Sequence, residues 1–249
     1  MAGFSSIPEM LRRDGTAAIR APDGRPTLSH AALADLAAAT VAWLNAHGIG
    51  RNDRVGIVLP NGPEMATAFL CIGAGATTAP LNPAYRAEEF DFYLSDLNAK
   101  AIVLPKGEGG AAREVAERRG VAVLELTPGE AAGAFTLEGG APGMAAHPGL
   151  AQPTDIALVL HTSGTTARPK IVPLSQANVA ASARHIGATL KLTPADTCLN
   201  IMPLFHIHGL IAAVLSSIAA GGAVICTPGF DALRFFRWLD EERPSWVTA

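Results

Sequence analysis

The sequence has little charge, few cysteines and no long apolar run. Only 16% of its 249 residues are charged, and the formal net charge is −3. A chain so close to neutral has no general field that attracts polyanions, so nucleic acid is not an expected partner and any phosphate must be bound locally. A hydrophobic content of 49% excludes a disordered chain and is enough for a globular protein with a sizeable core.

The three cysteines, Cys71, Cys198 and Cys226, are far apart and have apolar neighbours. They match neither a CxxC metal pattern nor a disulfide framework, which favours a reducing compartment and ordinary core thiols. No apolar run approaches the roughly 18 residues that a membrane-spanning helix needs. The first residues, "MAGFSSIPEMLRRDG", also lack the hydrophobic region of a signal peptide. We therefore expect a soluble cytoplasmic protein without a membrane partner.

Helical and strand-like segments alternate along the chain. Ser29 can cap a helix whose apolar positions recur at helical spacing. Further helices are predicted around residues 60–75 and 111–119, and after the caps Ser175 and Asp231. Short apolar runs predict buried strands at residues 54–59, 101–105, 121–126, 155–162, 170–174 and 221–228. This alternation is typical of an α/β fold with layered, mostly parallel sheets flanked by helices.

The composition divides the chain into three parts. Residues 1–127 are predicted to form a first α/β subdomain. Residues 128–153 are rich in Gly, Ala and Pro, and we expect an irregular connection there. Residues 154–249 are predicted to form a second α/β subdomain, which stops where a strand begins at "PSWVTA".

The segment "HTSGTTARPK", residues 161–170, follows an apolar strand and is unusually rich in small and hydroxylated side chains. Hydroxyl donors, a glycine that admits close backbone approach and a mobile ammonium group suit the binding of a phosphate. The residues that would supply them are Thr162, Ser163, Gly164, Thr165, Thr166 and Lys170. A solvated Ser/Thr-rich turn is the alternative, because such turns are common.

Two familiar nucleotide motifs do not apply to this chain. A Walker loop needs Gly before its Lys and Ser or Thr after it, whereas Pro169 and Ile171 occupy those positions. The segment "GAGATT" at 73–78 lacks the third Gly of a dinucleotide fingerprint and follows a predicted helix instead of a strand.

Three motifs in order resemble the adenylate-forming family, the AMP-forming acyl-CoA synthetases. "HTSGTTARPK" is similar to the phosphate loop of the family, "DRVGIVLPNGPEMATAFLCIGAGATTAPLNPAY" to its early strand, helix and turn, and "MPLFHIHGL" to its aromatic and histidine motif. The resemblance covers nearly the whole chain and is greatest to the oxalate–CoA ligase subgroup. The chain departs from the usual pattern at Ala167 and Ile171, where the family has Gly.

The resemblance implies a fold, a reaction and a set of ligands. The fold would be the N-terminal portion of the large domain of an adenylate-forming enzyme. Such an enzyme joins a small carboxylic acid to ATP, with Mg²⁺, as an acyl adenylate, and CoA then displaces AMP. Thr162 to Thr166 and Lys170 would contact the β- and γ-phosphates, where charge builds as pyrophosphate leaves.

The motif "PLFHIHG" contains the second group of candidate residues. By resemblance, His206 lines the acyl and adenylate pocket, as the candidate catalytic residue, and Phe205 and His208 belong to the same pocket. An imidazole donor there suits a small dianion such as oxalate, whose second carboxylate is costly to bury unpaired. A segment in the extended conformation would place both histidines on one face, where they could instead bind a metal or serve only structure. No third metal ligand is identifiable, so we assign no metal site.

Three hypotheses about function follow from these observations. The chain belongs to a ligase for oxalate or another short acid, to a ligase for longer aliphatic or aromatic acids, or to a silent nucleotide-binding or interaction domain. The family completes its nucleotide site with an acidic metal ligand, a ribose-binding Asp and a Lys from later segments, and no matching motif occurs here. We therefore expect these 249 residues alone to be inactive.

Overall fold

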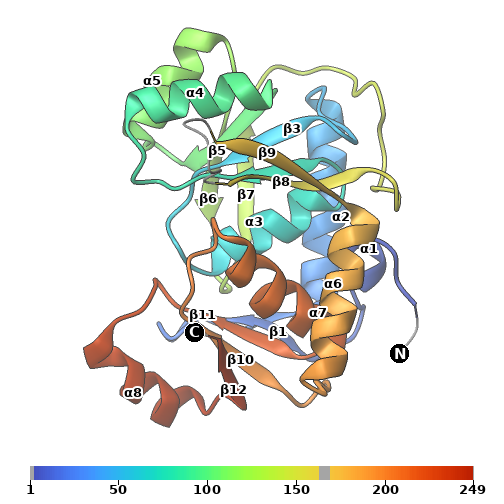
Figure 1. The fold of residues 1–249 in the computed structure, drawn as a ribbon, viewed down its shortest axis with the longest axis vertical. Coiled ribbons are helices and arrows are strands. Elements are labelled where there is room, and N and C mark those ends of the chain that lie inside the picture. The colour runs from blue at the N-terminus through green and yellow to red at the C-terminus, as the bar shows by residue number, and fades with distance from the viewer. Residues whose placement is uncertain (1–2, 163–168, 249) are drawn as a thin grey trace.

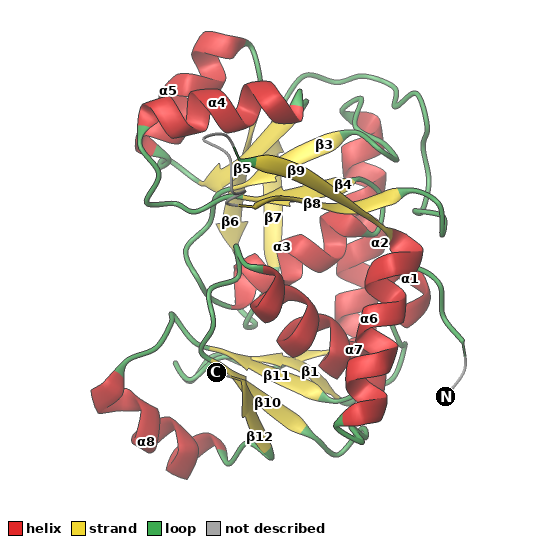
Figure 2. Cartoon of the chain, viewed as in Figure 1, coloured by secondary structure: helices red, strands yellow, loops and turns green. Residues whose placement is uncertain are grey.

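The computed structural model describes residues 3–162 and 169–248, which form two sheets with helices between and outside them (Figures 1 and 2). The helices are α1 Ile7–Met10, α2 His30–Ala46, α3 Pro63–Gly73, α4 Ala87–Leu97, α5 Gly110–Arg119, α6 Gln176–Thr189, the π-helix η1 His208–Leu215, α7 Ser216–Ala220 and α8 Ala232–Glu242. The strands are β1 Ala17–Arg20, β2 Leu28–Ser29, β3 Arg54–Ile57, β4 Thr77–Pro80, β5 Ala101–Pro105, β6 Ala122–Pro128, β7 Phe135–Gly139, β8 Ile156–Thr162, β9 Lys170–Ser175, β10 Thr197–Asn200, β11 Ala223–Cys226 and β12 Trp246–Thr248.

Both sheets are mostly parallel, as the alternation of segments predicts. The seven-stranded sheet has the order β7-β6-β5-β3-β4-β8-β9, and the five-stranded sheet has the order β12-β10-β11-β1-β2. The antiparallel strands β7, β9 and β2 lie at sheet edges. The central strands are therefore parallel, and each sheet has a single edge that carries their carboxyl ends.

Side chains that alternate along the strands separate the core into three parts. Ala101 and Val103 of β5 pack with the helices between the sheets, whereas Ile102 and Leu104 pack beneath α4 and α5. In the other sheet, Ile225 packs against Trp238 of α8 on the outer face. The result is a layered arrangement in which α2, α3, α6, η1 and α7 lie between the sheets, with α4 and α5 on one outside and α8 on the other (Figure 2).

Three of the predicted helix caps are confirmed by their hydrogen bonds. The hydroxyl of Ser29 accepts a bond from a backbone N–H in the first turn of α2, and that of Ser175 does the same for α6. The carboxylate of Asp231 accepts bonds from two N–H groups of α8. These caps satisfy donors that have no partner inside the helix, so they determine where each helix begins.

The three cysteines are buried and free, as expected for core thiols. Burial raises the pKa of Cys198 to about 12 and that of the other two thiols further. None of the helices in the described parts of the chain is both long and apolar enough to cross a bilayer.

The predicted division at residues 127 and 153 does not coincide with the sheets. Strands β1 and β2 of the first part pair beside β10–β12 of the last part, and β8 and β9 complete the sheet begun by β3–β7. The connection at 128–153 also contains β7, which pairs with β6. Periodicity reveals which face of an element is buried but not which partner covers it, so the subdomain boundaries at 127 and 153 stay a prediction.

Candidate functional site

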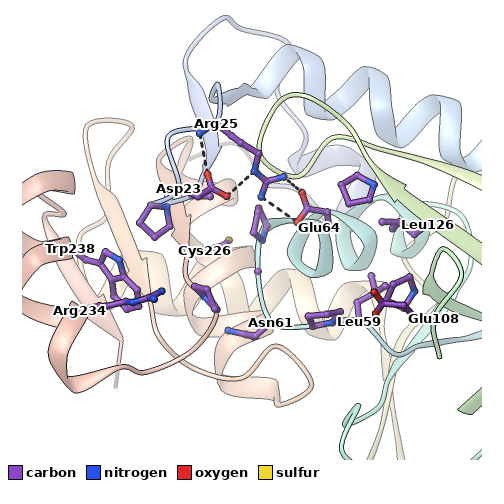
Figure 3. Close-up of a pocket in the computed structure, with 18 of the residues that line it drawn as sticks. Asp23, Arg25, Leu59, Asn61, Glu64, Glu108, Leu126, Cys226, Arg234 and Trp238 are labelled. Carbon is purple, nitrogen blue, oxygen red and sulfur yellow. Dashed lines mark hydrogen bonds and ion pairs between the residues drawn. The ribbon is translucent and has the colours of Figure 1, made fainter. Parts of the chain in front are cut away.

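The carboxyl ends of the parallel strands in both sheets border one cavity. It has a volume of about 340 Å³ and is lined by residues that follow β1, β3, β5 and β11, together with the end of β6 and the inner side of α8. We call it the inter-sheet cavity (Figure 3). In open α/β sheets, ligands bind beyond the carboxyl ends of the strands, so this edge is where a site is expected.

One wall of the inter-sheet cavity is a paired charge cluster (Figure 3). Arg25 donates to Glu64 at 2.5 Å and to Asp23 at 2.8 Å, and the carboxylates, Glu64 above all, raise its pKa. Glu64 also accepts a bond from the backbone N–H of Gly133 at 3.2 Å. These groups satisfy one another, so their main effect is to fix this wall.

The opposite wall belongs to α8 and is more loosely paired. Arg234 and Arg237 are more than half exposed, and their nearest carboxylate contacts, within the same helix, are 3.5 Å and 3.8 Å long. Trp238 lies between the helix and its sheet with 2% exposure. The cavity therefore combines an ion-paired wall, an apolar floor and two available guanidinium groups.

A second cavity of about 530 Å³ adjoins Phe205, and we call it the Phe205 cavity. Its lining is almost entirely apolar and comes from three loops: Asn61, Ile201, Met202, Pro203, Phe205, Pro228, Gly229 and Phe230. Asn61 and Pro228 line both cavities, so the two lie on either side of the same pair of residues.

The histidine motif follows β10 and forms a turn that leads into η1. His206 donates its backbone N–H to Pro203 at 3.3 Å, and Ile207 already has helical dihedral angles. The motif is therefore a turn and not the extended segment that would place both histidines on one face. In a helical turn, side chains two residues apart point about 200° apart, so His206 and His208 do not share a face.

The predicted pocket residues have different surroundings. Phe205 lines the cavity named after it, and the ring of His206 lies 4.5 Å from the ring of Phe205. His206 is exposed and does not line the cavities described above. His208 is also exposed, but its Nε2 forms a hydrogen bond with the hydroxyl of Thr248 on β12.

The predicted phosphate-binding residues are described only in part. Ser163, Gly164, Thr165 and Thr166 lie outside the described residues. Thr162 ends β8 and Lys170 begins β9, and the two are partners across this antiparallel pair, both exposed. Because β8 is parallel to β4, its carboxyl end lies at the same sheet edge as those of β3 and β5. Thr162 and Lys170 are thus brought together at the edge that borders the inter-sheet cavity.

Aromatic side chains support the end of β8 from the outside. The ring of His161 lies 4.6 Å from that of Tyr93 on α4, which stacks on Tyr85 at 4.9 Å. The Nε2 atom of His161 is 3.0 Å from a carboxylate oxygen of Asp96. Burial lowers the pKa of His161, although the nearby carboxylate of Asp96 opposes the effect.

Several residues at this edge were not singled out from the sequence as site residues. The sequence offers Asn61 or Gly62 as the cap of the helix predicted around residues 60–75; Gly62 caps α3, and the Asn61 side chain bonds to two other loops. Isolated arginines are common on protein surfaces, so the sequence alone does not mark Arg25 or Arg234 as site residues. The signal that could have identified Asn61 was its position just after the strand predicted at residues 54–59, because ligands bind beyond the carboxyl ends of parallel strands.

A metal site is not apparent in the described part of the chain. Within residues 3–162 and 169–248, no three His, Cys, Asp or Glu side chains lie together in a way that could hold an ion. We therefore give no residue of this chain the role of a metal ligand.

Comparison with known proteins identifies similar chains. A family model described as AMP-binding enzyme matches residues 10–249. An oxalate–CoA ligase from Arabidopsis thaliana is 40% identical over 233 residues, which are 91% of this chain and 45% of that protein. A probable CoA ligase, CCL9, from Humulus lupulus is 38% identical over 229 residues, 89% of this chain and 44% of that protein.

The same likeness is found among solved structures. Apo MatB from Rhodopseudomonas palustris superimposes with a TM-score of 0.81 at 25% identity, over 98% of this chain and 48% of that one. The predicted fold is thereby confirmed. The chain spans about half the length of the proteins it matches.

Proposed function

Because the chain belongs to the AMP-binding enzyme family, as its three motifs indicated, we propose that it is the N-terminal part of an ATP-dependent acid–CoA ligase. In the first half-reaction, a carboxylate oxygen of the acid forms a bond to the α-phosphorus of ATP, and the bond to pyrophosphate breaks. In the second, the thiol of CoA forms a bond to the acyl carbon, AMP leaves with the attacking carboxylate oxygen, and the thiol proton is released.

The observation that carries the proposal is the placement of Thr162 and Lys170. They are register partners at the last position of β8 and the first of β9, at the carboxyl edge of the sheet. An ammonium group and hydroxyl donors at this point would stabilise the charge that develops on the departing pyrophosphate. Lys170 is exposed and forms no ion pair with a described residue, so its charge is available to a ligand.

The acid would lie near the turn that contains Phe205 and His206. This turn follows β10 of the five-stranded sheet. The carboxyl end of β10 lies beside that of its parallel neighbour β11. We propose that His206 contacts the acid and that Phe205 forms a wall of its pocket, with His208 close by but bonded to Thr248. A small dianion such as oxalate fits the imidazole donor, and the relative with 40% identity is named oxalate–CoA ligase.

A longer aliphatic or aromatic acid is the second candidate. The Phe205 cavity favours it, because Ile201, Met202 and Phe230 offer apolar surface and few polar groups. An apolar acid gains from that surface, whereas oxalate does not.

Mg²⁺ would enter with ATP as the counter-ion of its phosphates. The described residues do not offer a ligand set of their own for it, so we derive no step from its presence. When bound, the ion neutralises charge on the phosphates.

Acid-dependent exchange of labelled pyrophosphate into ATP by the complete ligase tests the proposal. We expect exchange with oxalate or another short acid, and hexanoate and benzoate would be the probes for the second candidate. ATP binding without exchange for any acid would support a silent nucleotide-binding domain instead.

A further inference from the structure

The side chain of Asn61 joins the two sheets at their carboxyl edge. Its Nδ2 donates to the backbone oxygen of Thr227 at 2.9 Å, and its Oδ1 accepts from the backbone N–H of Leu204 at 2.8 Å. Asn61 follows β3 of the seven-stranded sheet, whereas Leu204 follows β10 and Thr227 follows β11 of the five-stranded sheet. One amide thus holds two loops of the opposite sheet at a set separation.

These two loops are themselves well fixed. The hydroxyl of Thr227 donates to the backbone oxygen of Asn200 at 2.9 Å and accepts from the N–H of Gly229 at 3.2 Å. Asn200, at the end of β10, also bonds to the backbone of Met202 through both ends of its amide. The loops therefore behave as rigid pieces, and the Asn61 amide is the link between them and β3.

The Phe205 cavity lies between the same segments. Its walls are residues 201–203 and 205 on one side and residues 228–230 on the other, and Asn61 lies where they meet. Asn61 also borders the inter-sheet cavity, where it is labelled in Figure 3. A change in the length of its two hydrogen bonds would move both walls of the Phe205 cavity and the turn that contains His206.

We propose that Asn61 is a positioning residue that sets the width of the acid pocket, an inference that rests on the proposed function. In this role Asn61 acts through Leu204 and Thr227 and needs no bond of its own to the acid or to ATP. The role requires a donor and an acceptor on one short side chain, and asparagine supplies both. Loss of Asn61 should therefore weaken use of the acid more than use of ATP.

Asn61→Asp is the sharpest substitution, because the two side chains have the same shape. The carboxylate keeps the acceptor for Leu204 but turns an acceptor toward the carbonyl oxygen of Thr227, where a donor is needed. Protonation of the new carboxyl group restores one donor. The defect should consequently shrink as the pH falls, which a purely steric or global change would not do.

The chain contains a matched control in Asn45. Its Nδ2 donates to the backbone oxygen of Ile49 at 3.0 Å, and its Oδ1 accepts from the N–H of Gly149 at 2.6 Å. It lies before β3, at the amino end of the strand, whereas Asn61 lies beyond the carboxyl end. Asn45→Asp thus disrupts the same kind of bridge at the edge of the sheet that carries the amino ends of the strands, away from the pocket.

The experiment compares KM for the acid and KM for ATP in the complete ligase, at several pH values, for the wild type, Asn61→Asp and Asn45→Asp. At pH 8 we expect Asn61→Asp to raise the acid KM by about five- to a hundredfold, with the ATP KM within about twofold of the wild type. The ratio of variant to wild-type acid KM should decrease toward pH 5.5. Asn45→Asp should leave both KM values within about twofold of the wild type.

Equal increases in both KM values, an unchanged acid KM, a ratio independent of pH, or the same effect in Asn45→Asp would overturn the inference. Amide hydrogen exchange tests the linkage without any activity. Exchange at Leu204 should accelerate in Asn61→Ala and Asn61→Leu but not in Asn61→Asp, and equal protection in all variants would also overturn it. A wild-type ligase that uses no acid, with Leu204 protected as expected, would instead refute the proposed function.

Discussion

Replacement of Lys170 by alanine separates a role in chemistry from a role in folding. Lys170 is exposed at the first position of β9 and forms no ion pair with a described residue. Its aliphatic stem covers little of the core, and its backbone partner, Thr162, is independent of the side chain. The substitution therefore removes one charge from the end of the hairpin and leaves the pairing of β8 with β9 unchanged.

The expected effects of Lys170→Ala on stability and on reaction rate differ enough to distinguish a role in folding from a role in chemistry. An exposed side chain without specific partners contributes within about 0.5 kcal/mol to the free energy of unfolding. Loss of one donor to a developing oxyanion costs about ten- to a thousandfold in rate, which is about 1.4 to 4 kcal/mol of transition-state stabilisation. Lys170→Ala should thus reduce pyrophosphate exchange strongly and stability hardly at all.

The assay is acid-dependent pyrophosphate exchange in the complete ligase, with urea denaturation of the same preparations. Lys100→Ala is the control, because Lys100 pairs with Asp53 at the amino ends of the strands, on the opposite edge of the sheet. It should leave exchange within about twofold of the wild type. Near-normal exchange in Lys170→Ala would refute the assignment, and so would a loss of exchange that is explained by unfolding.

Three further predictions concern the acid, the pH and the last helix. His206→Ala should raise the KM for the acid more than the KM for ATP, and loss of ATP binding with normal acid use would show that His206 is misplaced. Burial lowers the pKa of His30, so protonation of this side chain favours the unfolded chain. The free energy of unfolding should therefore fall as the pH drops through the pKa of an unfolded histidine, about 6.5. Urea titrations should show a smaller fall for His30→Gln. Asp231→Ala removes the cap of α8 and should lower the free energy of unfolding by about 0.5 to 2 kcal/mol, whereas no change in denaturation midpoint would mean that the cap is replaced by water.

The sequence predicted elements whose signals are local. Ser29, Ser175 and Asp231 were identified as caps because a short polar side chain precedes a helical apolar pattern, and each accepts the expected bonds. The strands on either side of residues 163–168 were likewise predicted, from the apolar run of β8 and the short run of β9.

Features that depend on distant partners could not be read in this way. Strand β1 pairs with β11, about two hundred residues later in the chain, and neither segment contains a local signal that identifies the other as its partner. The turn at His206 depends on the hydrogen bond that its backbone N–H donates to the carbonyl oxygen of Pro203, just before η1, and the residue pattern of the motif does not distinguish this turn from an extended segment. The bridge made by Asn61 depends on three loops at once, so only the folded chain reveals it.

The most direct test of the proposed adenylation is the fate of a carboxylate oxygen. Oxalate labelled with ¹⁸O in its carboxylates should be incubated with ATP, Mg²⁺, CoA and the complete ligase, and the released nucleotide analysed by mass spectrometry. Attack on the α-phosphorus followed by thiolysis transfers one labelled oxygen to AMP, so we predict AMP with a single ¹⁸O that appears together with oxalyl-CoA. Unlabelled AMP, or label found in orthophosphate with ADP as the nucleotide product, would contradict the account.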